Sequence, residues 1–414
     1  MERHRLLTAA VAVALAGSSL VVGTSAAVVA GGAPAGADGA TAFSYLTNFQ
    51  SNSVTEYAQG ASGNASPVTT IAGANTGLDG PEDVALDPSS GTSFVSNHLN
   101  DSVTEYAQGA SGNASPVTTI AGANTGLNVP DGLARDSSGN LFVANFYNSV
   151  TEYAQGASGN ASPITTIAGA NTGLNAPEDV TVDSSGNVFV ANFGDSVTEY
   201  AKGATGNVAP IATIAGGSTG LSGPLQLTLD PSSGTLFVAN HNSSVTEYAE
   251  GATGNVAPIA TIAGDNTGVT DPGGLALDSS GNLFVANFVN FDGSMTEYAK
   301  GATGNVAPIN TIAGSNTGID GPQGMTVVTT APHPGGYWEV GADGGIFAFG
   351  SAGFFGSMGG KPLNAPMVGM AATPDGKGYW EVAADGGIFT FGDAGSFGSM
   401  GGKPLNAPMV GMAA

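Results

Sequence analysis

The sequence predicts an all-β fold made of six copies of one antiparallel unit, and three observations support this prediction. The first is a pentapeptide, Ser-Val-Thr-Glu-Tyr in five copies and Ser-Met-Thr-Glu-Tyr in one, which starts at Ser53, Ser102, Ser149, Ser196, Ser244 and Ser294. The second is that each interval of 47 to 50 residues contains four short runs of strand-forming residues separated by turn residues. The third is the absence of apolar residues at helical spacing. Four short strands in a unit repeated at this interval are typical of β-propeller blades.

The four expected strands of a unit differ in their residue patterns, as the third full unit illustrates. Its strands are expected at residues 178–183, 188–192, 196–201 and 210–215. The first alternates apolar and polar residues, and the second is rich in β-branched and aromatic residues. Residues 183–187, Asp-Ser-Ser-Gly-Asn, form the turn between them, because Asp can bond the backbone ahead of it and Gly tolerates positive φ.

The two ends of the array predict ring closure. The first unit begins at residues 43–49, which match the second strand of later units, so this unit lacks an innermost strand. The last unit ends with an additional innermost strand at residues 324–328. We expect this late strand to complete the first blade and to close a six-bladed propeller over residues 43–330. An open array would leave two unpaired strand edges, which favour aggregation.

Residues 177–192 resemble the NHL-repeat pattern of a Pro, an apolar-x-apolar-Asp strand, a Gly-containing turn and an apolar-aromatic-Val-Ala strand. The resemblance covers residues 43–329 and implies a six-bladed propeller. NHL relatives include protein-binding modules, extracellular sensor domains and a few lyases or lactonases, so it does not specify an activity. The chain departs from the family at the end of the second strand, where it has Asn instead of Asp. We expect these residues to bond neighbouring turn backbone; they are Asn48, Asn97, Asn145, Asn192, Asn240 and Asn287.

The segments outside the array are expected to have separate roles. A basic start, an apolar stretch and small residues at the cleavage positions predict a signal peptide at residues 1–26, with residue 37 as the latest cleavage position. A retained N-terminal anchor is the alternative. We expect residues 27–42 to form a disordered leader. Residues 331–414 hold two copies of a 42-residue β-hairpin repeat and resemble repeats of secreted actinobacterial proteins. We expect a small β-rich appendage that packs on the propeller; the alternatives are pairing with another chain and the start of a longer array.

Composition restricts the classes of partner. The chain has 32 acidic and 8 basic residues, so its surface repels nucleic-acid phosphates and anionic membranes. It has no Cys, which excludes disulfides, thiol catalysis and Cys-ligated metals. We therefore expect a secreted or envelope-associated protein with no nucleic-acid partner and no membrane insertion after signal cleavage. The expected partner is a protein or carbohydrate at the cell surface.

The turn that enters each innermost strand is expected at one mouth of the central channel, where it supplies a candidate ligand site. The polar residues of these turns are Glu82, Asp83, Asp131, Glu178, Asp179, Gln226, Asp271 and Gln323. Carboxylate and amide oxygens around an axis suit a hard cation, so one hypothesis is calcium held by Glu82, Asp83, Glu178 and Asp179. The alternative is a solvated polar rim. We assign no catalytic residue and no cofactor other than this calcium.

Two further sets of residues are expected to be structural. His98 and His241 fall in opposite blades, too far apart to hold one zinc ion unless both side chains reach the axis of the ring. The six Glu of the repeated pentapeptide would be costly to bury without partners, so we expect them to reach water at the outer part of each blade.

We therefore predict a secreted, non-catalytic propeller that binds a protein or carbohydrate ligand at the cell surface. The near-identity of the blades favours this function, because enzymes on this fold usually diversify the residues of the channel mouth. Two alternatives are a divalent-metal-dependent lyase or lactonase at the channel mouth, and a structural wall or adhesion protein.

Overall fold

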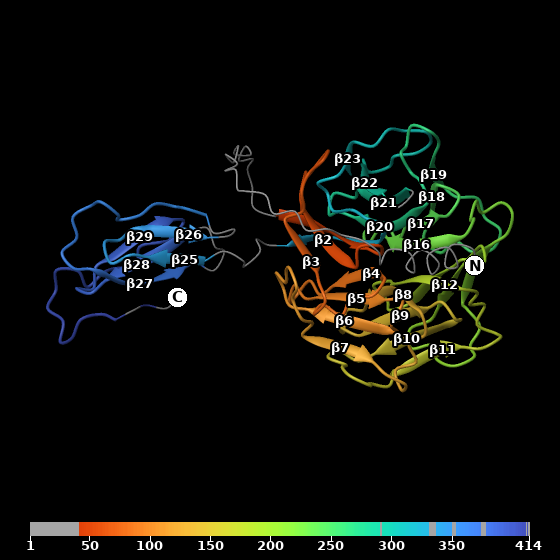
Figure 1. Ribbon diagram of the computed structural model, residues 1–414, viewed down its shortest axis with the longest axis horizontal. Helices are drawn as coiled ribbons and strands as arrows, with labels where there is room; N and C mark the ends of the chain where they lie inside the picture. The colour runs from red at the N-terminus through yellow and green to blue at the C-terminus, as the bar shows by residue number, and fades with distance from the viewer. Residues whose placement is uncertain are drawn as a thin grey trace, which may run out of the picture. The chain divides into compact units, whose positions relative to one another are not determined.

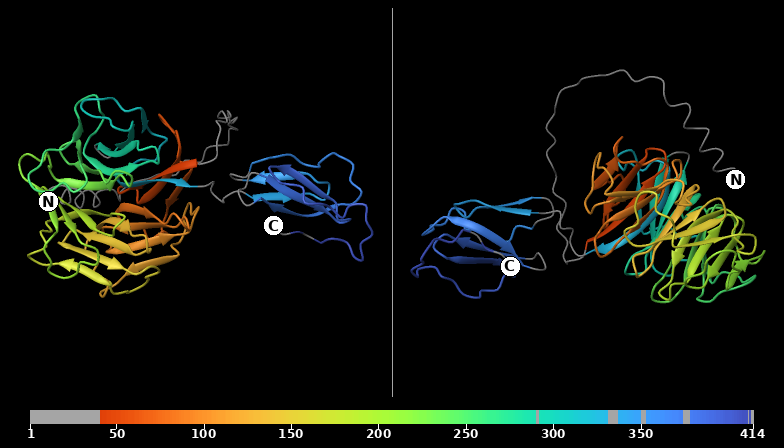
Figure 2. Two further views of the ribbon diagram at one scale, coloured as in Figure 1. Left: turned by 180° about the vertical axis from the view of Figure 1, so that it is seen from behind. Right: turned by 90° about the horizontal axis from the view of Figure 1, so that it is seen from below.

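The computed structural model describes residues 41–289, 292–330, 337–349, 353–373, 378–410 and 412. These residues form strands, turns and loops and contain no helix, which confirms the all-β prediction. The described part of the chain accordingly offers no helix long and apolar enough to cross a membrane. Residues 41–330 form six four-stranded antiparallel sheets, which Figures 1 and 2 show from three directions.

Each of these sheets is one blade, and its strands are named here from the centre outwards. Blade 1 contains β24 (Pro322–Thr330), β1 (Thr41–Asn48), β2 (Ser53–Ala58) and β3 (Thr69–Ala72). Blade 2 contains β4 (Pro81–Leu86), β5 (Ser93–Asn97), β6 (Ser102–Tyr106) and β7 (Thr118–Ala121). Blade 3 contains β8 (Pro130–Arg135), β9 (Leu141–Asn145), β10 (Ser149–Tyr153) and β11 (Thr165–Ala168).

The remaining three blades repeat the same order of strands. Blade 4 contains β12 (Pro177–Val182), β13 (Val188–Asn192), β14 (Ser196–Tyr200) and β15 (Ala212–Ala215). Blade 5 contains β16 (Pro224–Leu229), β17 (Leu236–Asn240), β18 (Ser244–Tyr248) and β19 (Ala260–Ala263). Blade 6 contains β20 (Pro272–Leu277), β21 (Leu283–Val289), β22 (Asp292–Tyr298) and β23 (Asn310–Ala313).

The innermost strands contact one another in a cycle, from β4 through β8, β12, β16 and β20 to β24 and back to β4. Blade 1 takes strands from both ends of the array, because β24 pairs antiparallel with β1. In this pairing Leu46 lies opposite Met325, and Phe43 lies opposite Val328. The apolar core lies between neighbouring blades; one of its clusters joins Val103 of blade 2 to Tyr153 of blade 3.

Hydrogen bonds between the outer loops also join neighbouring blades. The backbone N–H of Gly112 in blade 2 donates to the Thr70 carbonyl of blade 1 over 2.6 Å. The same bond recurs between blades 6 and 1, where the Gly63 N–H donates to the Thr311 carbonyl over 2.7 Å. The junction between the chain ends is therefore built like a junction between consecutive blades.

The Tyr of the repeated pentapeptide contacts the linker that precedes its blade. Each of these Tyr side chains is buried, and its hydroxyl donates to a Thr backbone carbonyl over 2.5 to 2.7 Å. Tyr57 of blade 1 makes this bond to Thr317, which lies in the linker that follows blade 6. The pentapeptide therefore has a structural role at every junction.

The Asn series has the structural role that the sequence predicts. In all six blades the Asn Oδ1 accepts from a backbone N–H in the turn before the innermost strand. In blade 2, for example, Asp79 N donates to Asn97 Oδ1 over 3.1 Å. The Asn Nδ2 groups donate to a carbonyl of their own strand and to Thr hydroxyls, so these buried amides have partners on both sides.

The expectation that the pentapeptide Glu residues reach water is wrong for three of them. Glu56, Glu152 and Glu247 are buried, and the other three are half-buried. Neutral donors solvate the buried carboxylates instead of Lys or Arg: Thr69 donates to Glu56 over 2.7 Å, and Thr165 donates to Glu152 over 2.8 Å. Burial raises the pKa of Glu247.

The C-terminal residues form two smaller sheets. One is the hairpin of β25 (Tyr337–Val340) and β26 (Ile346–Phe349), and the other contains β27 (Met367–Ala372), β28 (Gly378–Ala383) and β29 (Ile388–Gly392). At the other end of the chain, the expected signal peptide and most of the expected leader lie outside the described residues. Thr41 and Ala42, the last two residues of the expected leader, belong to β1.

Candidate functional site

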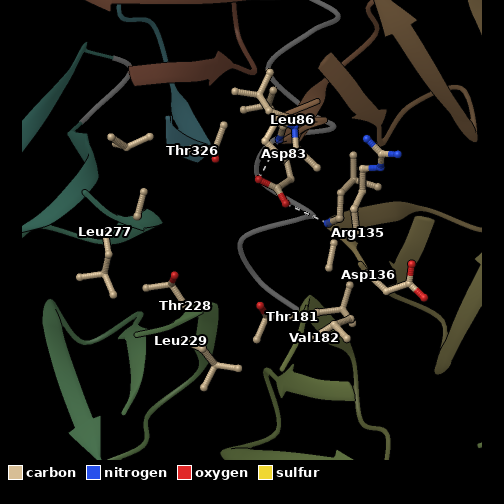
Figure 3. A pocket seen from close by; sticks show the side chains of 18 of the residues that line it. Asp83, Leu86, Arg135, Asp136, Thr181, Val182, Thr228, Leu229, Leu277 and Thr326 are labelled. Carbon is tan, nitrogen blue, oxygen red and sulfur yellow. Dashed lines mark hydrogen bonds between the residues drawn. The ribbon is translucent and has the colours of Figure 1, made fainter. Parts of the chain in front are cut away.

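An axial pocket of about 930 Å³ lies between the six innermost strands (Figure 3). Every innermost strand lines it, from a floor of buried residues to a rim of exposed turn residues such as Ser89 and Ser138. Figure 3 shows Thr181, Thr228 and Thr326 around this space. The pocket therefore follows the axis of the ring.

The floor of the pocket is formed by the third residues of β4, β12 and β16. These are Asp83, Asp179 and Gln226, and all three side chains are buried. Each accepts a hydrogen bond from the backbone of the next blade: Leu133 N donates to Asp83 Oδ2 (2.8 Å), Leu227 N to Asp179 Oδ2 (2.9 Å), and Leu275 N to Gln226 Oε1. The floor thus ties each of these blades to its neighbour.

Asp83 is the most fully bonded of the three. Its Oδ1 accepts from its neighbour Val84 N over 2.8 Å and from Gln226 Nε2 over 3.1 Å. Gln226 belongs to blade 5 and Asp83 to blade 2, so this bond joins opposite sides of the ring. Three donors leave Asp83 little capacity to bind a ligand directly.

The other three blades have glycine at the floor position, namely Gly132, Gly274 and Gly324. A Cβ on Gly132 would lie 2.1 Å from Asp179 Oδ1, and a Cβ on Gly324 would lie 2.1 Å from Asp83 Oδ1. Larger residues at these glycines would displace the two carboxyls. The floor therefore packs because three blades contribute Asp or Gln side chains and the other three contribute glycine.

The two floor carboxyls have different electrostatic environments. Burial raises the pKa of Asp83 to about 6, although its three hydrogen bonds oppose the shift. Burial and then the negative charge of Asp83 raise the pKa of Asp179 well above its usual value. Asp179 Oδ1 has no hydrogen-bond partner among the described residues. Both shifts favour retention of a proton by the pair, and the donors around Asp83 favour its charged form, so Asp179 is the more readily protonated of the two.

The walls and rim combine aliphatic, hydroxyl and acidic groups. Leu86, Leu229 and Leu277 line the walls together with the three Thr residues labelled in Figure 3. Arg135 is the single basic residue among the described lining residues. Its Nη1 lies 2.9 Å from Asp87 Oδ2, so its charge is already paired. No aromatic side chain is among the lining residues.

The other predicted site residues do not line this pocket; they are Glu82, Asp131, Glu178, Asp271 and Gln323. Of the four residues expected to hold calcium, the structure brings Asp83 and Asp179 together at the floor but separates them from the two Glu side chains. Glu82 and Asp131 instead lie beside His98, whose Nδ1 is 2.7 Å from Asp131 Oδ1 and 3.8 Å from Glu82 Oε1.

Sequence reasoning missed the role of the two His residues. Each pairs with an Asp of the following blade: His98 with Asp131, and His241 Nδ1 with Asp271 Oδ1 over 2.6 Å. A signal was present in the sequence. The residue after the Asn of the second strand is Phe in four blades and His in two. In both His cases, the next blade has an Asp beside the Pro that begins its innermost strand. Superposing neighbouring units would have shown it.

Comparisons with known proteins find similarity in fold. No protein-family model matches the chain, and no curated protein matches it either. Among solved structures, a functionally unknown protein from Desulfotomaculum acetoxidans DSM 771 is 12% identical with a TM-score of 0.47, covering 70% of this chain and 99% of that one. A streptogramin B lyase structure is 13% identical with a TM-score of 0.42, covering 74% of this chain and 91% of that one. These similarities are too low to bear on the chemistry of the pocket.

Proposed function

We propose that this protein is secreted and binds, without catalysis, a peptide segment of a partner protein in the axial pocket at the cell surface or envelope. The observation that carries the proposal is the pocket itself, about 930 Å³ in volume and lined by all six blades. Ligand pockets typically measure about 300 to 1,000 Å³, so the space suits a few amino-acid residues. The export signal expected at the N-terminus and the NHL resemblance support the location and the binding role.

The lining favours a peptide over a carbohydrate or an anion. Sugar rings commonly stack on aromatic faces, and the described lining residues include none. Thr hydroxyls and Leu side chains suit a backbone with mixed side chains. The acidic residues Asp136 and Asp278 at the rim, together with a net charge of -24, favour a neutral or basic segment.

Binding without catalysis is supported by the hydrogen bonds of two of the three floor residues. Asp83 accepts three hydrogen bonds from the protein, and Gln226 bonds both Asp83 and the backbone of blade 6. Groups so engaged position the blades and have little capacity to move protons on a substrate.

The test is a binding screen with the full chain. Labelled protein is exposed to three matched peptide libraries containing Lys, only neutral residues, or Asp, and to a glycan array. Thr228→Trp places an indole ring in the pocket, and Thr205→Trp, at an exposed position in an outer loop, is the control. We expect selection from the Lys-containing or neutral library, with loss in Thr228→Trp only. Binding that survives Thr228→Trp would contradict the proposal, and selection from the glycan array alone would replace the peptide with a carbohydrate.

A second candidate is the metal-dependent lyase or lactonase activity, and one observation favours it. Asp179 lines the pocket floor, and its buried Oδ1 has no hydrogen-bond partner among the described residues, so it keeps an unused acceptor for a cation or a substrate group. Calcium titration followed by thermal melting, with Asp179→Asn as the control, tests this candidate. A calcium-dependent rise in Tm that the variant lacks would support it, and an unchanged Tm would exclude the calcium site.

A further inference from the structure

A second cluster of polar side chains lies outside the axial pocket, where blades 2 and 3 meet. Glu82 comes from β4, His98 from the turn after β5, and Asp131 from β8. One ligand atom from each of them lies within 4.8 Å of the other two. The exposed fractions of the side chains are 12%, 9% and 4%, so the cluster is almost closed to solvent.

The backbone around each of these three residues is held in place. Thr47 Oγ1 donates to the Glu82 carbonyl over 2.8 Å, and Ser96 Oγ donates to the Asp131 carbonyl. The His98 N–H donates to the Gly80 carbonyl over 2.9 Å. The Phe49 ring and the imidazole pack in a T-shaped arrangement, with 5.9 Å between ring centroids. The donor atoms are therefore supported by a fixed frame, which lowers the entropic cost of binding an ion.

The chain contains a natural comparison for this cluster on the opposite side of the ring. His241 in blade 5 pairs with Asp271 of blade 6 over 2.6 Å, much as His98 pairs with Asp131. The residue that corresponds to Glu82, directly after the Pro that begins the innermost strand, is Leu225. The His241 pair therefore lacks the third donor, and its His side chain is 46% exposed.

The donor set determines the class of metal. One imidazole nitrogen and two carboxylate oxygens suit a borderline ion such as Zn²⁺, whereas Ca²⁺ takes six to eight oxygens. In a tetrahedral zinc site with bonds of about 2.0 to 2.2 Å, neighbouring ligand atoms lie roughly 3.4 Å apart. The two separations from His98 Nδ1, 2.7 Å and 3.8 Å, bracket this distance, and the two carboxylate oxygens lie within 4.8 Å of each other, so side-chain rotations can bring the three donors to it.

We propose that Glu82, His98 and Asp131 form a zinc-binding site that joins blades 2 and 3. Zinc binds Nδ1 of the neutral imidazole, whose proton then resides on Nε2, and one oxygen of each carboxylate. Three protein ligands leave the fourth tetrahedral position to water or to an external ligand. This site is separate from the axial pocket and does not depend on what the pocket binds.

The experiment is isothermal titration of the EDTA-treated full chain with Zn²⁺, repeated with millimolar Ca²⁺ present. Two variants remove one donor each: Glu82→Leu copies the Leu225 arrangement, and His98→Phe copies the Phe found at this position in four other blades. His241→Phe is the matched control. Circular dichroism melting of each variant without metal verifies folding.

We expect one Zn²⁺ to bind per chain, without competition from Ca²⁺. Each donor variant should lose more than about 100-fold in affinity, the upper end of the loss seen for supporting residues of metal sites, and His241→Phe should bind like the wild type. Three results would overturn the proposal: no zinc binding, wild-type affinity in either donor variant, or an equal loss in His241→Phe.

Discussion

Replacing Asp179 with Asn removes one buried carboxyl from the pocket floor while preserving its shape. In the wild type, the pKa of Asp179 is raised by burial and by the charge of Asp83, so the folded chain retains a proton that the unfolded chain loses near pH 4. A group whose folded pKa is raised stabilises the protein fully below its unfolded pKa and loses this contribution as pH rises through the folded pKa. Wild-type stability should therefore fall with rising pH relative to the variant.

The pKa of Asp83 shows how large an effect on stability burial at this floor can have. The pKa of Asp83 rises from 3.8 to about 6. Each pH unit over which the folded state holds one additional proton costs about 1.4 kcal/mol, so a shift of this size corresponds to about 3 kcal/mol. For Asp179, burial and the charge of Asp83 act in the same direction, so the unfolding free energy of Asp179→Asn minus that of the wild type should increase as pH rises above about pH 4.

The assay is urea unfolding at several pH values, monitored by circular dichroism, on the wild type, on Asp179→Asn and on one control variant. Subtracting the wild-type value at each pH cancels the titration of the groups that do not interact with Asp179, so the difference reports the Asp83–Asp179 pair. Asp265→Asn is the control, because this Asp is exposed in an outer loop. A difference that stays constant with pH, or one that is equally large in the control, would refute the argument that the floor holds a buried proton.

Three further predictions follow from single contacts. Gly132→Ala places a Cβ 2.4 Å from Asp179 Cα, so we expect a loss of about 3 kcal/mol in urea unfolding, while Gly217→Ala, with no atom within 4 Å, should be neutral. Tyr57→Phe and Tyr200→Phe each remove a buried hydroxyl bond and should each cost about 1 to 2 kcal/mol; a much smaller loss at Tyr57 would argue against the junction between the chain ends. Arg135→Met removes the basic group of the described pocket lining, so fluorescence anisotropy should show tighter binding of a Lys-containing peptide; weaker or unchanged binding would contradict the role of the acidic rim.

Much of the blade could be predicted from the sequence, because its signals are local and occur six times. The turn at residues 183–187, the strand at 188–192 and the structural Asn192 all follow from neighbouring residues. The burial of Glu56 could not be predicted in this way. Its donors include Tyr45 on one neighbouring strand and Thr69 on the other, and counting Lys and Arg residues takes no account of neutral donors.

The candidate site was less predictable, because it depends on strand offsets of one residue. Glu82 and Asp83 are adjacent in sequence, but only Asp83 lines the pocket. A register shift between Pro81 and Val84 adds to this, since simple alternation along the strand does not hold there. Asp131 directly follows Pro130, as Glu82 follows Pro81, so Asp131 corresponds to Glu82 and not to Asp83. The floor glycines gave no chemical signal at all, although the packing of the two carboxyls requires them.

The most direct test of the central claim is a crystal structure of the full chain with the tightest peptide from the binding screen. We predict peptide density within the axial pocket, between Thr181, Thr228 and Thr326 and above the floor at Asp179. Peptide bound elsewhere on the propeller or on the C-terminal sheets, with the axial pocket unchanged, would contradict it.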